Sequence, residues 1–122
     1  LDFKYNTAIA LMYTKAESPQ KASEHLKEAI ALFNKVLPKI ENASNANEQV
    51  IRGTFYKGLA YQKLDNYERA LGLYRYVVSL DRLYAPAWYN MGVCYERLEQ
   101  TVEANRHYMK YKQALEGGRD EF

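Results

Sequence analysis

The sequence of 122 residues predicts an all-α fold in which antiparallel helix pairs follow one another along the chain. Only three prolines and six glycines interrupt long stretches of helix-forming residues, whose apolar members recur at intervals of three and four. No segment shows the sustained alternation that is typical of a strand. Similar residues also recur 34 positions apart. The sequence therefore predicts about six helices in three hairpins, at about 3–44, 47–82 and 85–117, with a frayed tail at 118–122.

Two helix starts are predicted from capping residues. Ser18 and Pro19 favour a start because serine caps free amide groups and proline stands where no amide partner is needed. The stretch from Asp65 to Glu68 has the form of a capping box with aspartate as the cap.

Helix ends are predicted from turn-forming residues. The stretch from Asp81 to Pro86 is a break, with Pro86 in the first turn of the next helix. The polar stretch 42–47 predicts a longer connection, and Gly117 with Gly118 ends the last helix.

The 34-residue period rests on five pairs of similar residues. The pairs are Gly58 and Gly92, Tyr61 and Tyr95, Leu64 and Leu98, Ala70 and Ala104, and Tyr74 and Tyr108. Five matches at one offset indicate that a helix pair is duplicated. The small residues allow the two helices of a pair to approach closely, and the tyrosines are expected to fill the core around them.

A fainter copy precedes these two. Ala10 and Tyr13 are expected in the places of Gly58 and Tyr61, because the interval from the small residue to the alanine, here Ala22, is twelve in all three copies. The distance from Ala10 to Gly58 is 48 residues, 14 more than the period. We expect this excess to extend the second helix of the first hairpin until Pro38 bends or ends it.

The repeated residues resemble the tetratricopeptide repeat, whose pattern is W-x2-L-G-x2-Y, then A-x3-F, then proline, over 34 residues. The third copy supplies Trp88, Met91, Gly92, Tyr95, Ala104 and Tyr108. The second copy departs from the pattern at Lys57, where the family prefers leucine, and at Arg82, where it often has proline. The resemblance implies an α-solenoid, a right-handed superhelical array of helix pairs that binds other proteins.

The resemblance also implies a binding site. The first helices of the family line a concave groove that holds an extended or helical peptide. The groove positions carried across are Thr7, Leu11 and Thr14, then Phe55, Leu59 and Gln62, then Tyr89, Val93 and Glu96. This face is apolar and aromatic, the kind of surface that anchors a partner side chain. The alternative is that Phe55 and Tyr89 only pack across adjacent hairpins.

The predicted partner is a protein or peptide segment with an apolar anchor. Family members that bind the acidic C-terminal tails of heat-shock chaperones use lysine, arginine and asparagine at the groove positions. None of the three residue types stands at those positions here, so we expect no binding of a chaperone tail.

One basic row recurs, with Lys15, Lys63 and Arg97 each five residues beyond the small residue of its hairpin. We favour the interpretation that each cation stabilises the C-terminal end of a first helix through the helix dipole. The alternative is a basic rim that steers an acidic partner.

The last helix carries Met109, Tyr111 and Leu115, and by the repeat's geometry Tyr111 would face a further hairpin. An uncovered apolar face usually marks an interaction surface. We therefore expect this end to be covered, either by a second copy of the chain or by further sequence.

No catalytic, metal-binding or cofactor-binding residues are predicted. His25 and His107 stand in different hairpins, and the lone Cys94 has no histidine near it in sequence, so we expect all three to be structural. The net charge of +2 is too balanced to predict a nucleic-acid surface. No apolar run reaches the roughly 18 residues of a membrane span.

The expected function is therefore a non-enzymatic protein-interaction module, a scaffold, adaptor or assembly factor. Two alternatives stay open: a homo-oligomeric structural module that stacks through its ends, and a regulatory domain from a larger protein. The chain starts at Leu1, which suggests that the natural start is missing. A cytoplasmic location is slightly favoured over others.

Overall fold

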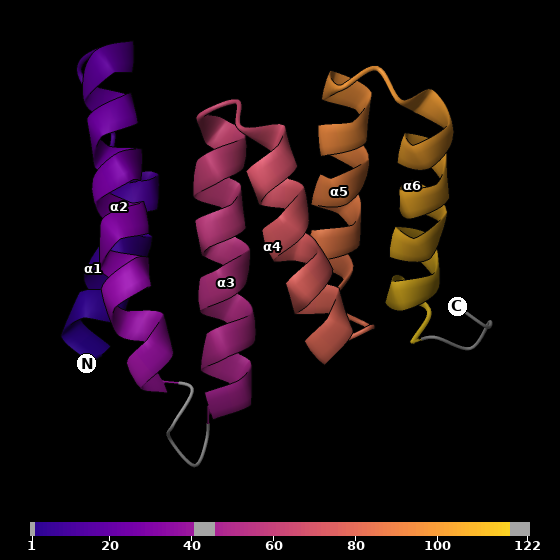
Figure 1. Ribbon diagram of the computed structural model, residues 1–122, viewed down its shortest axis with the longest axis horizontal. Helices are drawn as coiled ribbons and strands as arrows, with labels where there is room; N and C mark the ends of the chain where they lie inside the picture. The colour runs from indigo at the N-terminus through magenta and orange to yellow at the C-terminus, as the bar shows by residue number, and fades with distance from the viewer. Residues whose placement is uncertain (1, 41–45, 118–122) are drawn as a thin grey trace.

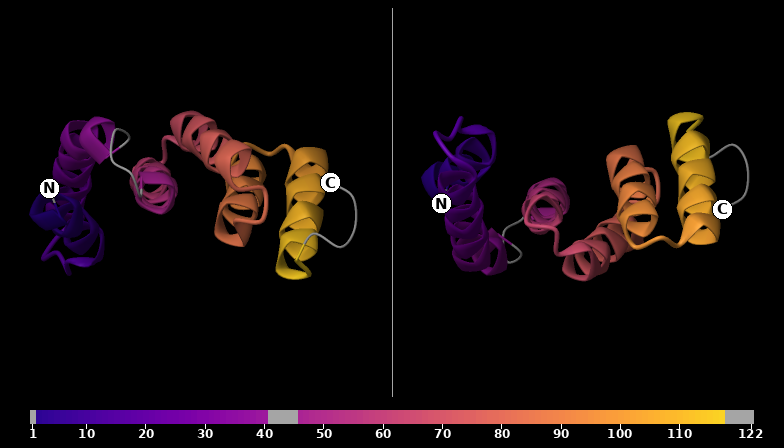
Figure 2. Two further views of the ribbon diagram at one scale, coloured as in Figure 1. Left: turned by 90° about the horizontal axis from the view of Figure 1, so that it is seen from below. Right: turned by 90° about the horizontal axis from the view of Figure 1, so that it is seen from above.

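The computed structural model describes residues 2–40 and 46–117, and within these residues it has six α-helices and no β-strand. The helices are α1 (Asp2–Tyr13), α2 (Pro19–Ile40), α3 (Ala46–Lys63), α4 (Tyr67–Leu80), α5 (Ala85–Arg97) and α6 (Thr101–Leu115). They stand in one row of antiparallel hairpins, with the pair α1 and α2 at one end of the row and α6 at the other (Figures 1 and 2). The predicted all-α fold of helix pairs is confirmed.

The core is continuous along the row. One buried cluster joins α1, α2 and one side of α3, with Phe33 and Val36 of α2 among its most buried members. A second cluster joins α3 to α6 around Tyr74 and Met91. Tyr56 and Tyr61 of α3 pack against both clusters, so α3 links the two halves of the molecule.

The repeated glycines lie where two helices of a hairpin come closest. A Cβ atom on Gly58 would lie 2.7 Å from Cε1 of Tyr74, so only glycine lets the α4 tyrosine pack on the α3 backbone. Gly92 of α5 has the same relation to Tyr108 of α6, where a Cβ would overlap the ring. Close packing of this kind explains why the glycine and the tyrosine recur together.

The second and third hairpins share one turn geometry. Each turn has three residues, and the middle one, Asp65 or Glu99, has a positive φ of 63° or 61°. The backbone amide of Asn66 donates to the carbonyl of Tyr61 at 2.9 Å, and that of Gln100 donates to Tyr95 at 2.8 Å. These bonds pair carbonyl groups that the end of a helix would otherwise leave free.

Most helix boundaries follow the prediction, but the cap of α4 does not. The hydroxyl of Ser18 accepts a hydrogen bond from the amide of Lys21 at 3.2 Å, which confirms the start of α2. The cap of α4 is Asn66, whose side chain accepts from the amide of Arg69 at 3.3 Å. The prediction of Asp65 as the cap was wrong because Asp65 lies in the middle of the turn, in the left-handed region.

The second helix is extended as predicted, over 22 residues. Pro38 does not end it, since α2 continues to Ile40. Leu37 of this extension packs on Gly53 of α3, where a Cβ would lie 2.5 Å from Cδ2 of Leu37. The extension therefore widens the contact between the first and second hairpins.

The register of the first hairpin differs from the prediction. Five residues connect α1 to α2, whereas three connect the helices of the other hairpins. Ala10 and Tyr13 are exposed, and Tyr13 reaches 63% exposure, while Ala8 is fully buried. Ala8 lies five residues before the end of its helix, as Gly58 and Gly92 do. The repeated interval of twelve residues was thus misleading. The first turn is two residues longer than the others, so the buried small residue of α1 is Ala8, two positions before Ala10.

Three predicted features lie wholly or partly outside the described residues. The connection predicted at 42–47 overlaps the described chain only where α3 has already begun at Ala46. The tail at 118–122 and Gly118 are not described. Gly117, with a φ of 75°, follows directly after the last turn of α6.

Candidate interaction surface

The first helices of adjacent hairpins, α1, α3 and α5, contact one another, so their shared side forms a candidate surface. Phe55 was predicted to present its ring there, but it is only 8% exposed. Its ring centroid lies 5.6 Å from that of Tyr74 and 5.4 Å from that of Tyr84, the residue just before α5. Phe55 therefore joins the second hairpin to the third and belongs to the core, as in the alternative interpretation.

Tyr89, at the same repeat position as Phe55, stays 46% exposed. Its ring centroid lies 5.6 Å from that of Tyr108 and 5.2 Å from that of Tyr111, both on α6. These two contacts leave the Tyr89 ring partly accessible to solvent. Leu59 and Val93, one helical turn further along, are half-buried.

Gln62 and Glu96 take part in hydrogen bonds to the core tyrosines. The hydroxyl of Tyr74 donates to Oε1 of Gln62 at 2.6 Å, and the hydroxyl of Tyr108 donates to Glu96. Burial raises the pKa of Tyr74 and Tyr108 well above the ordinary tyrosine value, and for Tyr108 the bond to Glu96 adds to the effect. Gln62 therefore helps to hold α3 against α4, and Glu96 helps to hold α5 against α6.

The groove positions predicted for the first hairpin are shifted by the register error. Thr7 and Leu11 are half-buried, and Thr14 lies beyond the end of α1. The hydroxyl of Thr14 donates to the carbonyl of Ala10 at 2.9 Å, which closes the last turn of the helix. Thr14 is therefore a helix-end residue rather than a groove residue.

Three residues of this surface were missed. Tyr13 was placed in the core, yet it is exposed and its ring meets Tyr56 of α3 edge-on at 6.1 Å. Tyr56 also hydrogen-bonds with Arg52, and this bond raises the pKa of the guanidinium. Burial and a hydrogen bond with Tyr56 raise the pKa of Tyr13. The only sequence signal was the number of tyrosines, twelve, which is more than the core positions can take.

The basic row is only partly as predicted. Lys63 and Arg97 are the last residues of α3 and α5, where a cation interacts favourably with the helix dipole. Lys15 lies two residues beyond α1, so the dipole interpretation fails for it. The longer first turn is again the cause.

The predicted end-to-end surface on α6 is also corrected. Met109 and Leu115 are exposed, but Tyr111 is half-buried against Tyr89 of its own hairpin. Val102, one residue after the start of α6, is exposed as well and was not predicted. The other exposed residues of α6 are polar, namely Thr101, Asn105, Arg106 and Lys112.

The histidine and the cysteine of the third hairpin pack into the core. His107 is nearly buried between Trp88 and Tyr95, with Nδ1 at 2.7 Å from the carbonyl oxygen of Glu103. Burial raises the pKa of the Cys94 thiol to about 12, so at neutral pH it is not the thiolate that a nucleophile needs. No group of three or more metal-ligating side chains occurs among residues 2–40 and 46–117.

Comparison with known proteins identifies the repeat. Residues 86–114, which span most of α5 and α6, match the family model of the tetratricopeptide repeat. Two similar solved structures are titled "Crystal structure of MamA" and "MamA MSR-1 C2". The first is 18% identical with a TM-score of 0.55, covering 97% of this chain and 84% of that one. The second is 14% identical with a TM-score of 0.55, covering 96% and 95%.

Likeness at this level of identity shows the fold alone. It extends the helical-repeat architecture from the matched hairpin over nearly the whole chain. No curated protein matches the sequence. Among the described helices, none has the length and apolar character needed to cross a membrane.

Proposed function

We propose, from the premise that this chain is a tetratricopeptide-repeat array, that it is a scaffold or adaptor that binds a partner protein along its first helices. The observation that carries this proposal is the pair of exposed aromatic side chains, Tyr13 and Tyr89, on α1 and α5. Tyrosine is enriched at binding hot spots because it offers a large apolar face and one hydroxyl.

The proposed surface differs from the one that the repeat pattern indicates. The proposed surface keeps Leu59, Tyr89 and Val93 of the predicted groove. It leaves out Thr7, Leu11 and Phe55, and it includes Tyr13, Arg52 and Tyr56 instead. Arg52 lies beside the hydroxyls of Tyr5 and Tyr56, so the N-terminal part of this surface combines aromatic rings with a cation. The C-terminal part, at Tyr89 and Val93, is aromatic and apolar. The partner segment would place an apolar side chain against Tyr89 and Val93.

A chaperone C-terminal tail does not suit this surface. Tail recognition in the family relies on lysine, arginine and asparagine at the groove positions, and here those positions hold Leu59, Tyr89 and Val93. We therefore expect a peptide that ends in a run of acidic residues to bind no better than a scrambled one.

Affinity capture with the chain, followed by identification of the bound proteins, tests the proposal. Tyr13→Ala combined with Tyr89→Ala should weaken capture at least about tenfold, since hot-spot aromatics contribute upwards of about 2 kcal/mol. Leu80→Ala, at an exposed apolar residue of α4 outside this surface, is the control. Equal capture by the double variant and the wild type would exclude this surface.

Self-association is a second candidate function, favoured by Val102 and Met109, which are exposed seven residues apart on one face of α6. Two such residues form a small apolar contact between copies of the chain. Sedimentation at rising concentration measures it, and Met109→Lys should shift the chain toward the monomer. A chain that stays monomeric at all concentrations would rule it out.

A further inference from the structure

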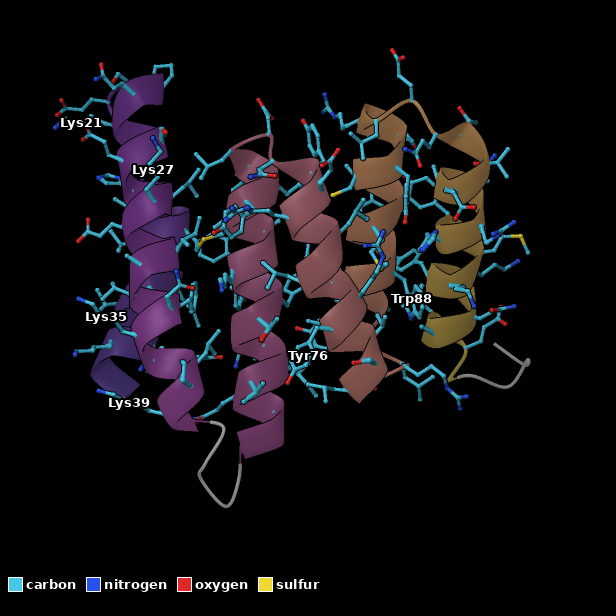
Figure 3. All side chains as sticks on the ribbon, viewed as in Figure 1. Lys21, Lys27, Lys35, Lys39, Tyr76 and Trp88 are labelled. Carbon is cyan, nitrogen blue, oxygen red and sulfur yellow. The ribbon has the colours of Figure 1, made fainter. Side chains whose placement is uncertain are left out.

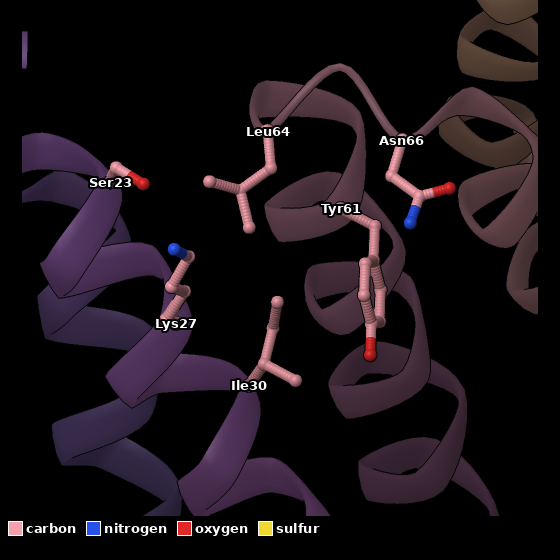
Figure 4. Close-up of a pocket in the computed structure, with 6 residues that line it drawn as sticks. All are labelled: Ser23, Lys27, Ile30, Tyr61, Leu64 and Asn66. Atoms are coloured by element: carbon pink, nitrogen blue, oxygen red, sulfur yellow. The ribbon is translucent and has the colours of Figure 1, made fainter.

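A groove runs along α3 on the side where α2 and α4 flank it. Three adjoining hollows of about 450, 290 and 330 Å³ make it up, and they share lining residues: Tyr61 joins the first to the second, and Lys57 and Leu73 join the second to the third. Figure 4 shows the first hollow, where Lys27 and Ile30 of α2 face Tyr61 of α3 and Leu64 of the turn that follows it. The third hollow lies beside Leu37 and Tyr76.

The groove is open because two core positions of the repeat hold unusual residues. In the third hairpin these positions hold Trp88 and Met91, which are buried. Thirty-four residues earlier, α3 carries Thr54 and Lys57 instead, and both line the groove. The difference in side-chain volume leaves the space between α2 and α4 unfilled.

The opposite wall shows the same contrast. In the third hairpin Lys110 of α6 lies over the ring of Trp88, with Nζ 5.3 Å from the ring centroid. The equivalent residue of α4 is Tyr76, which has no tryptophan to cover and is exposed (Figure 3). Its ring and Leu73 therefore form an apolar wall that no described residue covers completely.

Gly72 supports a ligand at this place. A Cβ atom on Gly72 would meet nothing within 4 Å, so packing inside the chain does not require a glycine, in contrast to Gly58. A glycine inside a helix weakens that helix relative to alanine. Gly72 lines the middle hollow, and the absence of its side chain keeps the groove wide and lets a bound backbone come close.

The charge of the groove is one-sided. Among the described residues that line it, Lys27, Lys57 and Arg69 are basic and none is acidic. Lys57 is half-buried in the floor and has no ion pair with another described residue, and Arg69 is held against Tyr61 by a hydrogen bond of 3.3 Å. The other labelled lysines of α2, at 21, 35 and 39, lie on the side of α2 that faces away from α3 in Figure 3.

We propose that this groove is a second binding site, and that it takes an acidic, apolar segment of a partner protein. Carboxylates of the segment pair with Lys27, Lys57 and Arg69, and one large apolar side chain inserts between Leu37, Leu73 and Tyr76. A half-buried lysine and an apolar wall select for this combination, since neither charge nor apolarity alone complements the groove. The site lies on α2, α3 and α4 and does not depend on the exposed tyrosines of α1 and α5.

A selection from a library of short random peptides, carried out on the whole chain, tests this inference. We expect the selected peptides to combine aspartate or glutamate with an aromatic or large aliphatic residue. Their affinity should fall as ionic strength rises, because part of the binding is electrostatic. A selection without acidic peptides would overturn the proposal, as would a single-stranded oligonucleotide that displaces the selected peptides.

Two variants separate the groove from other surfaces. Gly72→Gln places a side chain in the groove at an exposed position and should weaken binding about tenfold or more. Arg106→Gln is the matched control at the equivalent position of α6, and it should bind as the wild type does. Equal binding by the Gly72 and Arg106 variants would place the peptides elsewhere and overturn the proposal.

Charge reversal gives a readout that loss of folding cannot imitate. Lys57→Glu should lose affinity for the selected acidic peptides and gain affinity for the same peptides with lysine in place of each acidic residue. Tyr13→Ala with Tyr89→Ala should leave both affinities unchanged, which separates this site from the surface of the first helices. No gain for the basic peptides, in a variant that keeps its helical circular dichroism, would contradict the role of Lys57.

Discussion

The second and third hairpins are the two most alike parts of the molecule, and they differ at the contact with the preceding hairpin. Both place a glycine under a tyrosine, and both tie that tyrosine to a polar residue of the first helix, Gln62 or Glu96. The third hairpin closes its contact with Trp88 and Met91, whereas the second leaves it open. The two hairpins therefore share the contact between their own two helices, the glycine under the tyrosine. They differ in the side chains at the contact with the preceding hairpin.

The largest expected effect comes from opening the closed contact. Trp88→Thr introduces the residue of the second hairpin, removes the hydrogen bond from Nε1 to the carbonyl of Arg82 at 2.8 Å, and leaves a cavity. Truncation of a buried tryptophan costs about 3–5 kcal/mol, and we expect a loss in that range by denaturant unfolding. Tyr89→Thr, at a half-exposed ring on the same helix, should cost less than about 1 kcal/mol. Equal losses would mean that Trp88 does not close this contact.

A smaller effect is expected at the shared internal contact. Gly58→Ala forces a methyl group against Tyr74, which is fully buried and has no room to move, so the variant should lose about 1–3 kcal/mol of unfolding free energy. Gly92→Ala presses on Tyr108 in the same way, but that ring is half-exposed and swings outward more easily. We expect the loss at Gly92 to be the smaller one, although Gly92→Leu should still be severe. A reversed order would show that Tyr74 has more freedom than its burial indicates.

The same tyrosines predict how stability depends on pH. Burial keeps the phenol of Tyr74 neutral in the folded state, because its pKa is raised above the unfolded value of about 10. The stabilising contribution is complete below that pH and declines as pH rises above it, by about 1.4 kcal/mol per pH unit for this residue. Tyr74→Phe should make the loss of stability above about pH 10 less steep, even though the variant loses the bond to Gln62. Denaturant unfolding at several alkaline pH values measures this slope, and an unchanged slope would contradict the assignment.

The smallest effect is a gain. Gly72→Ala adds a methyl group that meets no other atom and removes a glycine from the middle of α4, so the variant should gain about 0.5–1 kcal/mol. The gain appears as a higher midpoint of thermal unfolding. The opposite sign from Gly58→Ala, one helix earlier, distinguishes a glycine kept for a groove from a glycine required by packing. A loss at Gly72 would mean that the wall of the groove is already filled.

Prediction from sequence succeeded where local rules and the repeat agree. The offset of 34 residues between Gly58 and Gly92 reflects a close contact within one hairpin, which depends on residues near in sequence. The tetratricopeptide repeat at 86–114, the extended α2 and the start of α2 at Pro19 were predicted for the same reason. Each of these features depends on the spacing of small and apolar residues along one or two helices.

Prediction failed where the burial of a residue depends on an insertion in a turn or on a contact with another hairpin. The interval from Ala10 to Ala22 matched the repeat by coincidence, since two extra turn residues place Ala8 at the buried position. Phe55 was expected on the binding surface, but Tyr84 from the following hairpin covers it. No pattern within one repeat indicates which side chain of the next repeat will cover a given position.

The sequence by itself determined the helix pairs, because the contacts inside a hairpin join residues close along the chain and repeat with its period. The tertiary structure alone decided which aromatic side chains are exposed and where a groove opens. Those outcomes depend on the volumes of side chains that meet from different hairpins: Thr54 and Lys57 leave open between α2 and α4 what Trp88 and Met91 fill between α4 and α6. The side chains that meet between repeats are far apart in sequence. Only their positions in space show whether their combined volume fills the space between the helices.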